Sequence, residues 1–292
     1  MTFAGLYVAL VTPFSDGKVD YGALQDLVLF HLDSGTTGLV PCGTTGESAT
    51  LSHEEHRRVI ETVIQTADGQ CQVIAGTGSN STAEAIEMTK HAKEAGADGA
   101  LVITPYYNKP TQEGLYRHFR AVADAVQIPI MLYNVPSRTA VNMLPDTVIR
   151  LADHDNIVAI KEASGDLSQA TEILRGCEID VLSGDDPLTL PLMAIGGTGV
   201  VSVVGNIVPK EVMAMIEAFN AGNLAEARKA HQRLYPLCKS MFLETNPIPV
   251  KTAMKLLGRG NGEMRLPMCE MKDETRNALQ SALTQFGMTG NA

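Results

Sequence analysis

The chain has 292 residues, of which 45% are hydrophobic and 19% charged, a composition typical of folded globular proteins. Its 23 basic and 33 acidic side chains leave a net charge of −10, which argues against binding along a nucleic-acid duplex or to an anionic membrane. The chain has no tryptophan and only 5% aromatic residues, which also argues against an aromatic platform for stacking single-stranded bases. We expect neither a nucleic-acid nor a membrane partner.

The pattern of charges and cysteines predicts a cytoplasmic protein. No basic flank precedes the apolar run near the N-terminus, so we expect no secretory signal. The uncharged stretch 187–209 is interrupted by prolines and glycines, which favours a buried helix, a turn and a buried strand over a membrane span. The five cysteines are widely spaced and form no C-x-x-C motif, which fits a reducing compartment and excludes a zinc ribbon.

Eight short runs rich in Val and Ile recur along the chain, and most are continuous rather than alternating. This is the pattern of parallel strands that are covered on both faces. The runs are 6–11, 38–42, 72–75, 100–104, 130–135, 157–162, 180–183 and 199–204.

Segments with helical signals lie between these runs. Capping-box patterns begin at Ser52 and Ser81, and a weaker one begins at Asp166. Glycines mark the expected helix ends, at Gly35, Gly96, Gly176 and Gly222.

Eight β-α units predict a (β/α)8 TIM barrel over residues 1–222. A doubly wound open sheet is the alternative, but no glycine-rich phosphate loop follows the first run. Residues 223–292 show helical patterns only, so we expect a C-terminal helical extension rather than a second catalytic domain.

In such a barrel the active site lies at the carboxyl ends of the strands, which makes Lys161 the strongest candidate. It lies near the end of run 157–162 and shares a strand face with Ala159 and Ala163, whose small side chains leave room for a ligand. A buried lysine either acts as a nucleophilic amine that forms a Schiff base or pairs with a carboxylate. Glu162 is a poor partner because adjacent strand residues point to opposite faces.

Hydroxyl groups and one arginine also lie at the ends of runs. Tyr133, Thr44 and Tyr107 together suggest a chain of hydroxyls that carries a proton, although Tyr133 alone also fits a core tyrosine. Thr45 and the backbone beside it suit a carboxylate, or simply a helix-capping turn. Arg138 suits a bidentate grip on a carboxylate, or is a surface arginine.

Two polar pairs raise the question of a metal. His53 and His56 lie on one helix face, but no third ligand has metal spacing, so we expect no metal site there. Asp185 and Asp186 suit Mg²⁺ in an enolate-forming barrel enzyme. Because the phosphate-gripping elements that often accompany such chemistry are missing, we favour a structural role for this pair, or a role in supporting neighbouring residues of the site.

The chain resembles the dihydrodipicolinate synthase family, which lies within the pyruvate-dependent class I aldolases together with N-acetylneuraminate lyase. The resemblance extends over nearly the whole chain, and the motifs occur in the order of the family. The segments that carry it are GTTGESATL (43–51), TPYYNKPTQEGLY (104–116), YNVPSRT (133–139), IKEASGD (160–166), LSGDD (182–186) and NPIPVK (246–251). Pro41, Cys42 and Gly205 depart from the common pattern without removing a catalytic group.

The resemblance implies an enzyme of lysine and diaminopimelate biosynthesis that condenses pyruvate with L-aspartate 4-semialdehyde to 4-hydroxy-tetrahydrodipicolinate. Lys161 would form the imine with pyruvate, and Tyr133 would donate and accept protons. Thr44 and Tyr107 would complete the relay, with Tyr107 reaching into the site of a neighbouring subunit. No metal or organic cofactor is implied.

The substrate and regulatory sites follow from the same resemblance. Thr45, Gly184 and the backbone near Val201 would hold pyruvate, and Arg138 would bind the carboxylate of the semialdehyde. The family is usually a homotetramer built from two tight dimers. Feedback inhibition by L-lysine is implied at seven matching positions, which are Ser48, Ala49, His53, His56, Asn80, Glu84 and Tyr106.

Two other functions remain open from the sequence. A related aldolase acting on a sugar acid or a hydroxy-oxo acid would share the fold and the lysine. A non-catalytic barrel that binds a keto acid as a regulator would form no covalent adduct. Taken without the resemblance, the seven positions also fit a capped surface cleft with two solvated histidines.

Overall fold

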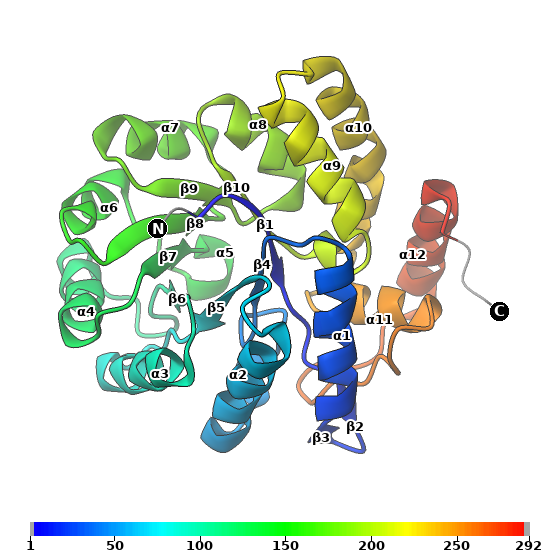
Figure 1. The fold of residues 1–292 in the computed structure, drawn as a ribbon, viewed down its shortest axis with the longest axis horizontal. Coiled ribbons are helices and arrows are strands. Elements are labelled where there is room, and N and C mark those ends of the chain that lie inside the picture. The colour runs from blue at the N-terminus through cyan, green and yellow to red at the C-terminus, as the bar shows by residue number, and fades with distance from the viewer. Residues whose placement is uncertain (1–2, 289–292) are drawn as a thin grey trace.

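The computed structural model describes residues 3–288 and shows a closed barrel of eight parallel strands surrounded by helices (Figure 1). The closed barrel confirms the predicted (β/α)8 fold and excludes an open doubly wound sheet. Strands that follow one another in the chain are neighbours in the barrel, and the last strand pairs with the first. The barrel strands are β1 (Gly5–Ala9), β4 (Gly38–Val40), β5 (Gln72–Gly76), β6 (Gly99–Ile103), β7 (Ile130–Asn134), β8 (Ile157–Glu162), β9 (Asp180–Ser183) and β10 (Gly199–Ser202).

Each of the eight predicted runs coincides with a barrel strand, but five of these strands end earlier than predicted: β6 and β7 by one residue, and β1, β4 and β10 by two. The strand β4 ends at Val40 because Cys42 has a left-handed backbone (φ 56°), which a regular strand does not contain. The strand β10 ends at Ser202 because the next residues form a 3₁₀ turn over Val204–Asn206. The strand β1 ends at Ala9 rather than at residue 11.

Helices follow the strands and form the outer layer of the barrel. They are α1 (Tyr21–Asp33), α2 (His53–Ala67), α3 (Thr82–Ala95), α4 (Gln112–Ala125), α5 (Pro136–Thr139), α6 (Pro145–Ala152), α7 (Leu167–Gly176), α8 (Thr189–Ala194) and α9 (Pro209–Asn220). The stretch 187–209 contains the helix α8 and the buried strand β10, as predicted. Within residues 3–288, no helix is long and apolar enough to cross a membrane.

The predicted helix caps are only partly confirmed. Ser52 and Glu55 form a complete capping box at the start of α2. The box predicted for Ser81 is wrong, because its hydroxyl caps nothing and Glu84 bonds the hydroxyl of Ser79 instead. Asp166 caps α7 by accepting two backbone N–H bonds.

A short hairpin after β1 was not predicted. Its strands are β2 (Phe14–Ser15) and β3 (Lys18–Val19), and they pair in antiparallel fashion. Asp16 and Gly17 form the turn, and both have positive φ angles (51° and 74°). The Asp-Gly pair is a recognised signal for such a turn, so the hairpin was predictable.

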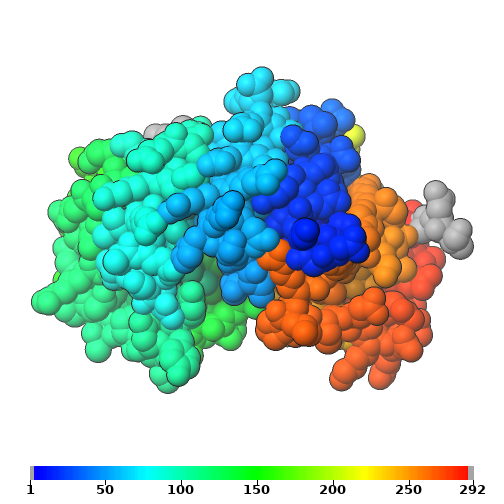
Figure 2. Space-filling model, turned by 90° about the horizontal axis from the view of Figure 1, so that it is seen from below, coloured from blue at the N-terminus to red at the C-terminus, as the bar shows by residue number. Residues whose placement is uncertain are grey.

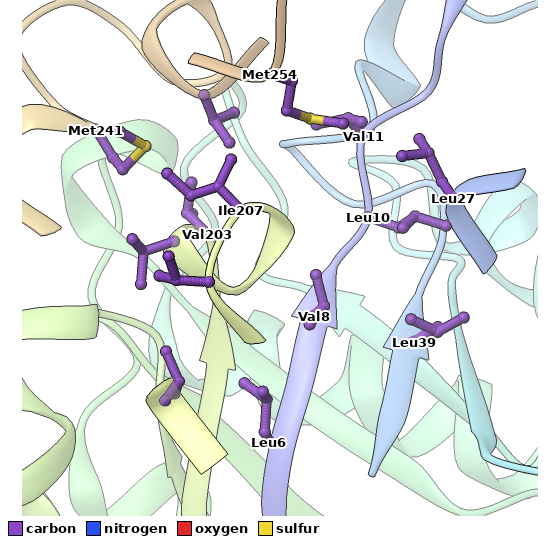
Figure 3. Close-up of a cluster of buried hydrophobic side chains, with 14 of the residues drawn as sticks. Leu6, Val8, Leu10, Val11, Leu27, Leu39, Val203, Ile207, Met241 and Met254 are labelled. Carbon is purple, nitrogen blue, oxygen red and sulfur yellow. The ribbon is translucent and has the colours of Figure 1, made fainter. Parts of the chain in front are cut away.

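The C-terminal region is helical, as predicted, and packs against the barrel. It consists of α10 (Leu224–Ser240), α11 (Ile248–Leu256) and α12 (Asp273–Phe286). In the buried cluster of Figure 3, Met241 and Met254 from this region lie beside Val11 and Ile207 from the barrel. The two regions therefore share a hydrophobic core. On the face seen in Figure 2, the orange C-terminal region directly abuts the blue N-terminal region.

Candidate active site

Tyr133 and Lys161 face each other at the carboxyl end of the barrel. They are register partners on β7 and β8. Alternation along the strands directs both side chains into the barrel interior, where Met131 and Ala159 also lie. Lys161 is only 5% exposed, and its Nζ lies 4.2 Å from the centre of the Tyr133 ring. The two strands thus bring an amine and a phenol together inside the barrel.

The next pair of residues on the same strands faces the opposite way. The carboxylate of Glu162 accepts bonds from Asn134 (3.2 Å), Gln169 (3.1 Å) and the backbone N–H of Ser164 (2.6 Å). Glu162 is therefore satisfied outside the barrel and is not the partner of Lys161, as the strand geometry predicted. The Lys161 amine lies over the ring of Tyr133 instead.

Gly184 follows β9 and lies directly against Lys161. A Cβ atom at Gly184 would stand 3.0 Å from Cε and 3.1 Å from Cγ of Lys161, and 2.6 Å from the Cβ of Ala163. Only glycine, which has no Cβ, lets the Lys161 side chain keep the position seen in the structure. Val201 on β10 is fully buried in the same interior cluster as Tyr133.

A cavity of about 510 Å³ opens beside these residues. Thr44, Tyr133 and Arg138 line it. The next residue, Thr45, is buried, and its Oγ1 accepts a bond of 3.0 Å from the side-chain amide of Asn246. Arg138 is exposed on α5, and its guanidinium donates to the backbone carbonyl of Asn246 at 3.3 Å.

The same cavity extends to most of the predicted lysine-binding residues. Those that line it are Ser48, Ala49, His53, His56, Glu84 and Tyr106. His53 on α2 lies 3.3 Å from the carboxylate of Glu84 on α3. Burial lowers the pKa of His56 to about 4, so this imidazole is neutral at pH 7. Asn80 donates to the backbone carbonyl of Tyr106 at 3.1 Å and so holds the loop after β6.

One chain does not bring Tyr107 into the cavity. Its side chain is 91% exposed, and its backbone has a left-handed conformation with φ 73°. A large aromatic side chain exposed to this degree is unusual for a residue with only a packing role. Thr44 and Tyr133 thus line one cavity and Lys161 lies against Tyr133, while Tyr107 does not line that cavity.

Of the two candidate metal carboxylates, Asp186 has structural partners. Asp186 is buried and accepts bonds from the hydroxyl of Ser202 (2.5 Å) and from the backbone N–H groups of Val203 and Val204 (both 2.9 Å). Burial raises the pKa of Asp186, and these bonds oppose the rise. Over residues 3–288, no group of three or more His, Cys, Asp or Glu side chains is arranged to hold a metal ion.

Sequence reasoning missed three buried polar residues next to the site. Glu47 and Lys251 form a buried ion pair with 2.6 Å between the carboxylate and the amine, and Asn246 bonds Thr45. All three occur in segments that carry the family resemblance, GTTGE and NPIPVK, but the sequence offered no role for them. Their partners lie about 200 positions away, and a single sequence does not reveal such contacts.

Comparison with known proteins places this geometry in one family. The model of the dihydrodipicolinate synthetase family matches residues 2–286. The 4-hydroxy-tetrahydrodipicolinate synthase of Geotalea daltonii is 59% identical over 286 residues, which covers 97% of this chain and 99% of the relative.

Solved structures agree with that assignment over the full length. A dihydrodipicolinate synthase structure from Cyanidioschyzon merolae with lysine bound has a TM-score of 0.96 and 45% identity, and covers 98% of this chain and 99% of that one. A chloride-inhibited synthase from Acinetobacter baumannii in complex with pyruvate also has a TM-score of 0.96 and 45% identity, with 98% and 100% coverage. The chain therefore belongs to the dihydrodipicolinate synthetase family.

Proposed function

We propose that the chain is an enzyme that condenses pyruvate with L-aspartate 4-semialdehyde to 4-hydroxy-tetrahydrodipicolinate, with Lys161 as its Schiff-base nucleophile. The observation that carries the proposal is the buried Lys161 amine, 4.2 Å above the Tyr133 ring at the carboxyl end of the barrel. A buried amine of this kind, beside a hydroxyl and an open cavity, suits imine chemistry. The activity of the full-length relatives supports the same reaction.

The chemistry then follows from the positions of these groups. The Lys161 amine adds to the keto carbon of pyruvate, and loss of water leaves a protonated imine. The imine withdraws electrons, so the methyl group loses a proton and an enamine forms. The enamine carbon attacks the aldehyde carbon, and the amine of the semialdehyde then closes the ring and releases Lys161. Because the imine itself is the electron sink, this sequence requires no metal or organic cofactor.

Proton transfers in these steps belong to hydroxyl groups. Tyr133 lies beside the Lys161 amine, and Thr44 lines the same cavity. We assign Tyr133 as the main proton donor and acceptor and Thr44 as its relay partner. The exposed Tyr107 would join this relay only across a contact with a second copy of the chain, which supports a tight dimer within a homotetramer.

Substrate binding is assigned to groups around the amine. Gly184 and the backbone near Val201 lie at the ends of β9 and β10, and we assign them with Thr45 to pyruvate. Arg138 lines the open part of the cavity and presents a planar cation to the carboxylate of the semialdehyde.

Regulation and cellular context form the last part of the proposal. We assign L-lysine as an inhibitor that binds between α2, α3 and the loop after β6, where Glu84 supplies a carboxylate for an ammonium group. We also assign residues 1–222 as the catalytic barrel, 223–292 as its helical extension, and the cytoplasm as its location.

The decisive experiment is covalent trapping. Wild-type protein incubated with pyruvate and borohydride should gain one reduced pyruvyl group on the Lys161 peptide, as read by mass spectrometry. The Lys161→Ala variant should lose the adduct and nearly all activity. An adduct on the exposed Lys109 instead would contradict the assignment. Assays with L-aspartate 4-semialdehyde and with sugar-derived aldehydes separate this synthase from related aldolases.

A further inference from the structure

The loop 43–47, which carries Thr44, ends in a residue that needs outside support. Glu47 has a left-handed backbone with φ 53°, a conformation that side chains other than glycine rarely adopt. Its carboxylate is buried, with only 5% of the residue exposed. A buried carboxylate is stable only when it is paired and hydrogen-bonded. The partners of Glu47 therefore decide the conformation of the loop end.

Those partners come from the C-terminal region. Lys251 on α11 is 4% exposed, and its Nζ donates to Glu47 Oε1 at 2.6 Å and to the backbone carbonyl of Thr12 at 2.9 Å. The same amine lies 4.4 Å from the centre of the Phe14 ring. The other carboxylate oxygen of Glu47 accepts the backbone N–H of Arg265 at 3.2 Å. Burial lowers the pKa of Lys251, and Glu47 opposes this effect.

A second bond attaches the same segment to the same loop. Asn246 lies just before α11 and donates from its side chain to Thr45 Oγ1 at 3.0 Å. The segment 246–251 therefore holds loop 43–47 at Thr45 and at Glu47. Thr44 lies immediately before this doubly anchored stretch and faces the cavity that Tyr133 lines.

We propose that Glu47 and Lys251 are positioning residues for the reaction, which orient loop 43–47 so that Thr44 and Thr45 meet the pyruvate imine. This inference rests on the proposed function of the site. A hydrophobic pair of similar volume would fill the same space and often preserves stability. It would not reproduce the bonds that Lys251 donates to Glu47 and to the Thr12 carbonyl, nor the bond that Glu47 accepts from the Arg265 backbone. The ion pair thus supplies orientation, which packing alone does not.

The test compares stability with activity in the double variant Glu47→Met/Lys251→Met. Each single replacement leaves a buried charge without its partner and should lower Tm. The double variant should recover a Tm within about 5 °C of wild type. Its kcat/KM for pyruvate should nonetheless stay about tenfold or more below wild type. The KM for the semialdehyde, which Arg138 binds from α5, should change by less than about threefold.

A matched control lies on the same helix. Lys255 is exposed and approaches Glu270 at 3.8 Å on the surface, so Lys255→Met should leave all these values at the wild-type level. A double variant with wild-type kcat/KM for pyruvate would show that the pair only contributes stability. If the double variant is unfolded, the isosteric Glu47→Gln variant takes its place. It should lose about threefold or more of kcat/KM for pyruvate, and an unchanged value overturns the inference.

Borohydride trapping separates this inference from the function on which it rests. Wild-type protein that forms no pyruvyl adduct on Lys161 refutes the proposed function. Wild-type and double-variant proteins that form the adduct at equal rates refute only the positioning role. Slower adduct formation in the double variant, with normal formation in Lys255→Met, supports both.

Discussion

Gly184 shows how one missing side chain supports the candidate site. A Cβ atom there would lie 3.0 Å from Cε of Lys161, closer than nearly all real contacts of this kind. The φ angle of Gly184 is outside the left-handed region, so alanine would fit the local backbone conformation, but its Cβ would press on the Lys161 stem and stand only 2.6 Å from the Cβ of Ala163. We expect Gly184→Ala to lose some stability through the contact with Ala163 and to lose about 10- to 100-fold in kcat, because a displaced nucleophile reacts slowly.

The measurement for Gly184→Ala is the rate of borohydride-trapped adduct formation together with kcat. Gly22→Ala is the control, since Gly22 lies on the exposed side of α1. A Cβ atom added there would meet only Asp20 Oδ1, at an ordinary contact distance of 3.5 Å. That change should leave kcat unaltered and stabilise the helix by up to about 1 kcal/mol. Equal kcat values for Gly184→Ala and wild type would remove Gly184 from the site.

At the scale of elements, the sequence predicted the strands well because a buried parallel strand has a local signature. The runs 157–162 and 180–183 match β8 and β9 residue for residue. Strand ends were less predictable, since the left-handed backbone of Cys42 depends on its surroundings. One cap and one pairing were also missed, because both depend on which side chains meet in the folded chain. Glu84 bonds Ser79 rather than capping α3, and Glu47 meets Lys251 from 204 positions away.

Two elements, α2 and α3, form the proposed regulatory cleft. His53 and Glu84 face each other across it at 3.3 Å, and the ammonium group of a bound lysine would replace this contact. Millimolar L-lysine should inhibit the wild-type enzyme. In Glu84→Ala the concentration for half-inhibition should rise by about 10- to 150-fold, because a charged hydrogen bond contributes about 1.5 to 3 kcal/mol. Activity without lysine should be retained.

The control for the cleft is Glu87→Ala, one turn further along α3. Glu87 pairs with Arg57 at the surface and does not line the cavity, so its removal should leave inhibition unchanged. Steady-state rates against lysine concentration give the answer. If wild type is insensitive, or if both variants are inhibited like wild type, the regulatory assignment is wrong while the Lys161 assignment stands.

On the scale of the whole molecule, the barrel and the C-terminal helices share a hydrophobic cluster, so we expect them to unfold together. His31 on α1 lies inside the molecule with no exposed surface. Its Nδ1 is 3.3 Å from Thr36 Oγ1, and within residues 3–288 its Nε2 has no hydrogen-bond partner. Burial, with a smaller contribution from the charge of Arg259, lowers the pKa of His31 to about 3.

This depressed pKa predicts a loss of stability in mild acid. Below about pH 6.5 the unfolded chain binds a proton at His31 and the native protein does not, so the free energy of unfolding falls as pH falls. The contribution reaches about 2 kcal/mol at about pH 5.

Urea unfolding at about pH 7.5 and about pH 5, at one fixed protein concentration, measures this contribution of His31 to the free energy of unfolding. In His31→Leu the fall between these two pH values should be smaller by about 2 kcal/mol. His56 and His118 are also buried with pKa values lowered to about 4, but they remain in both proteins and cancel in the comparison. Parallel losses in wild type and variant would show that His31 does not control the acid response.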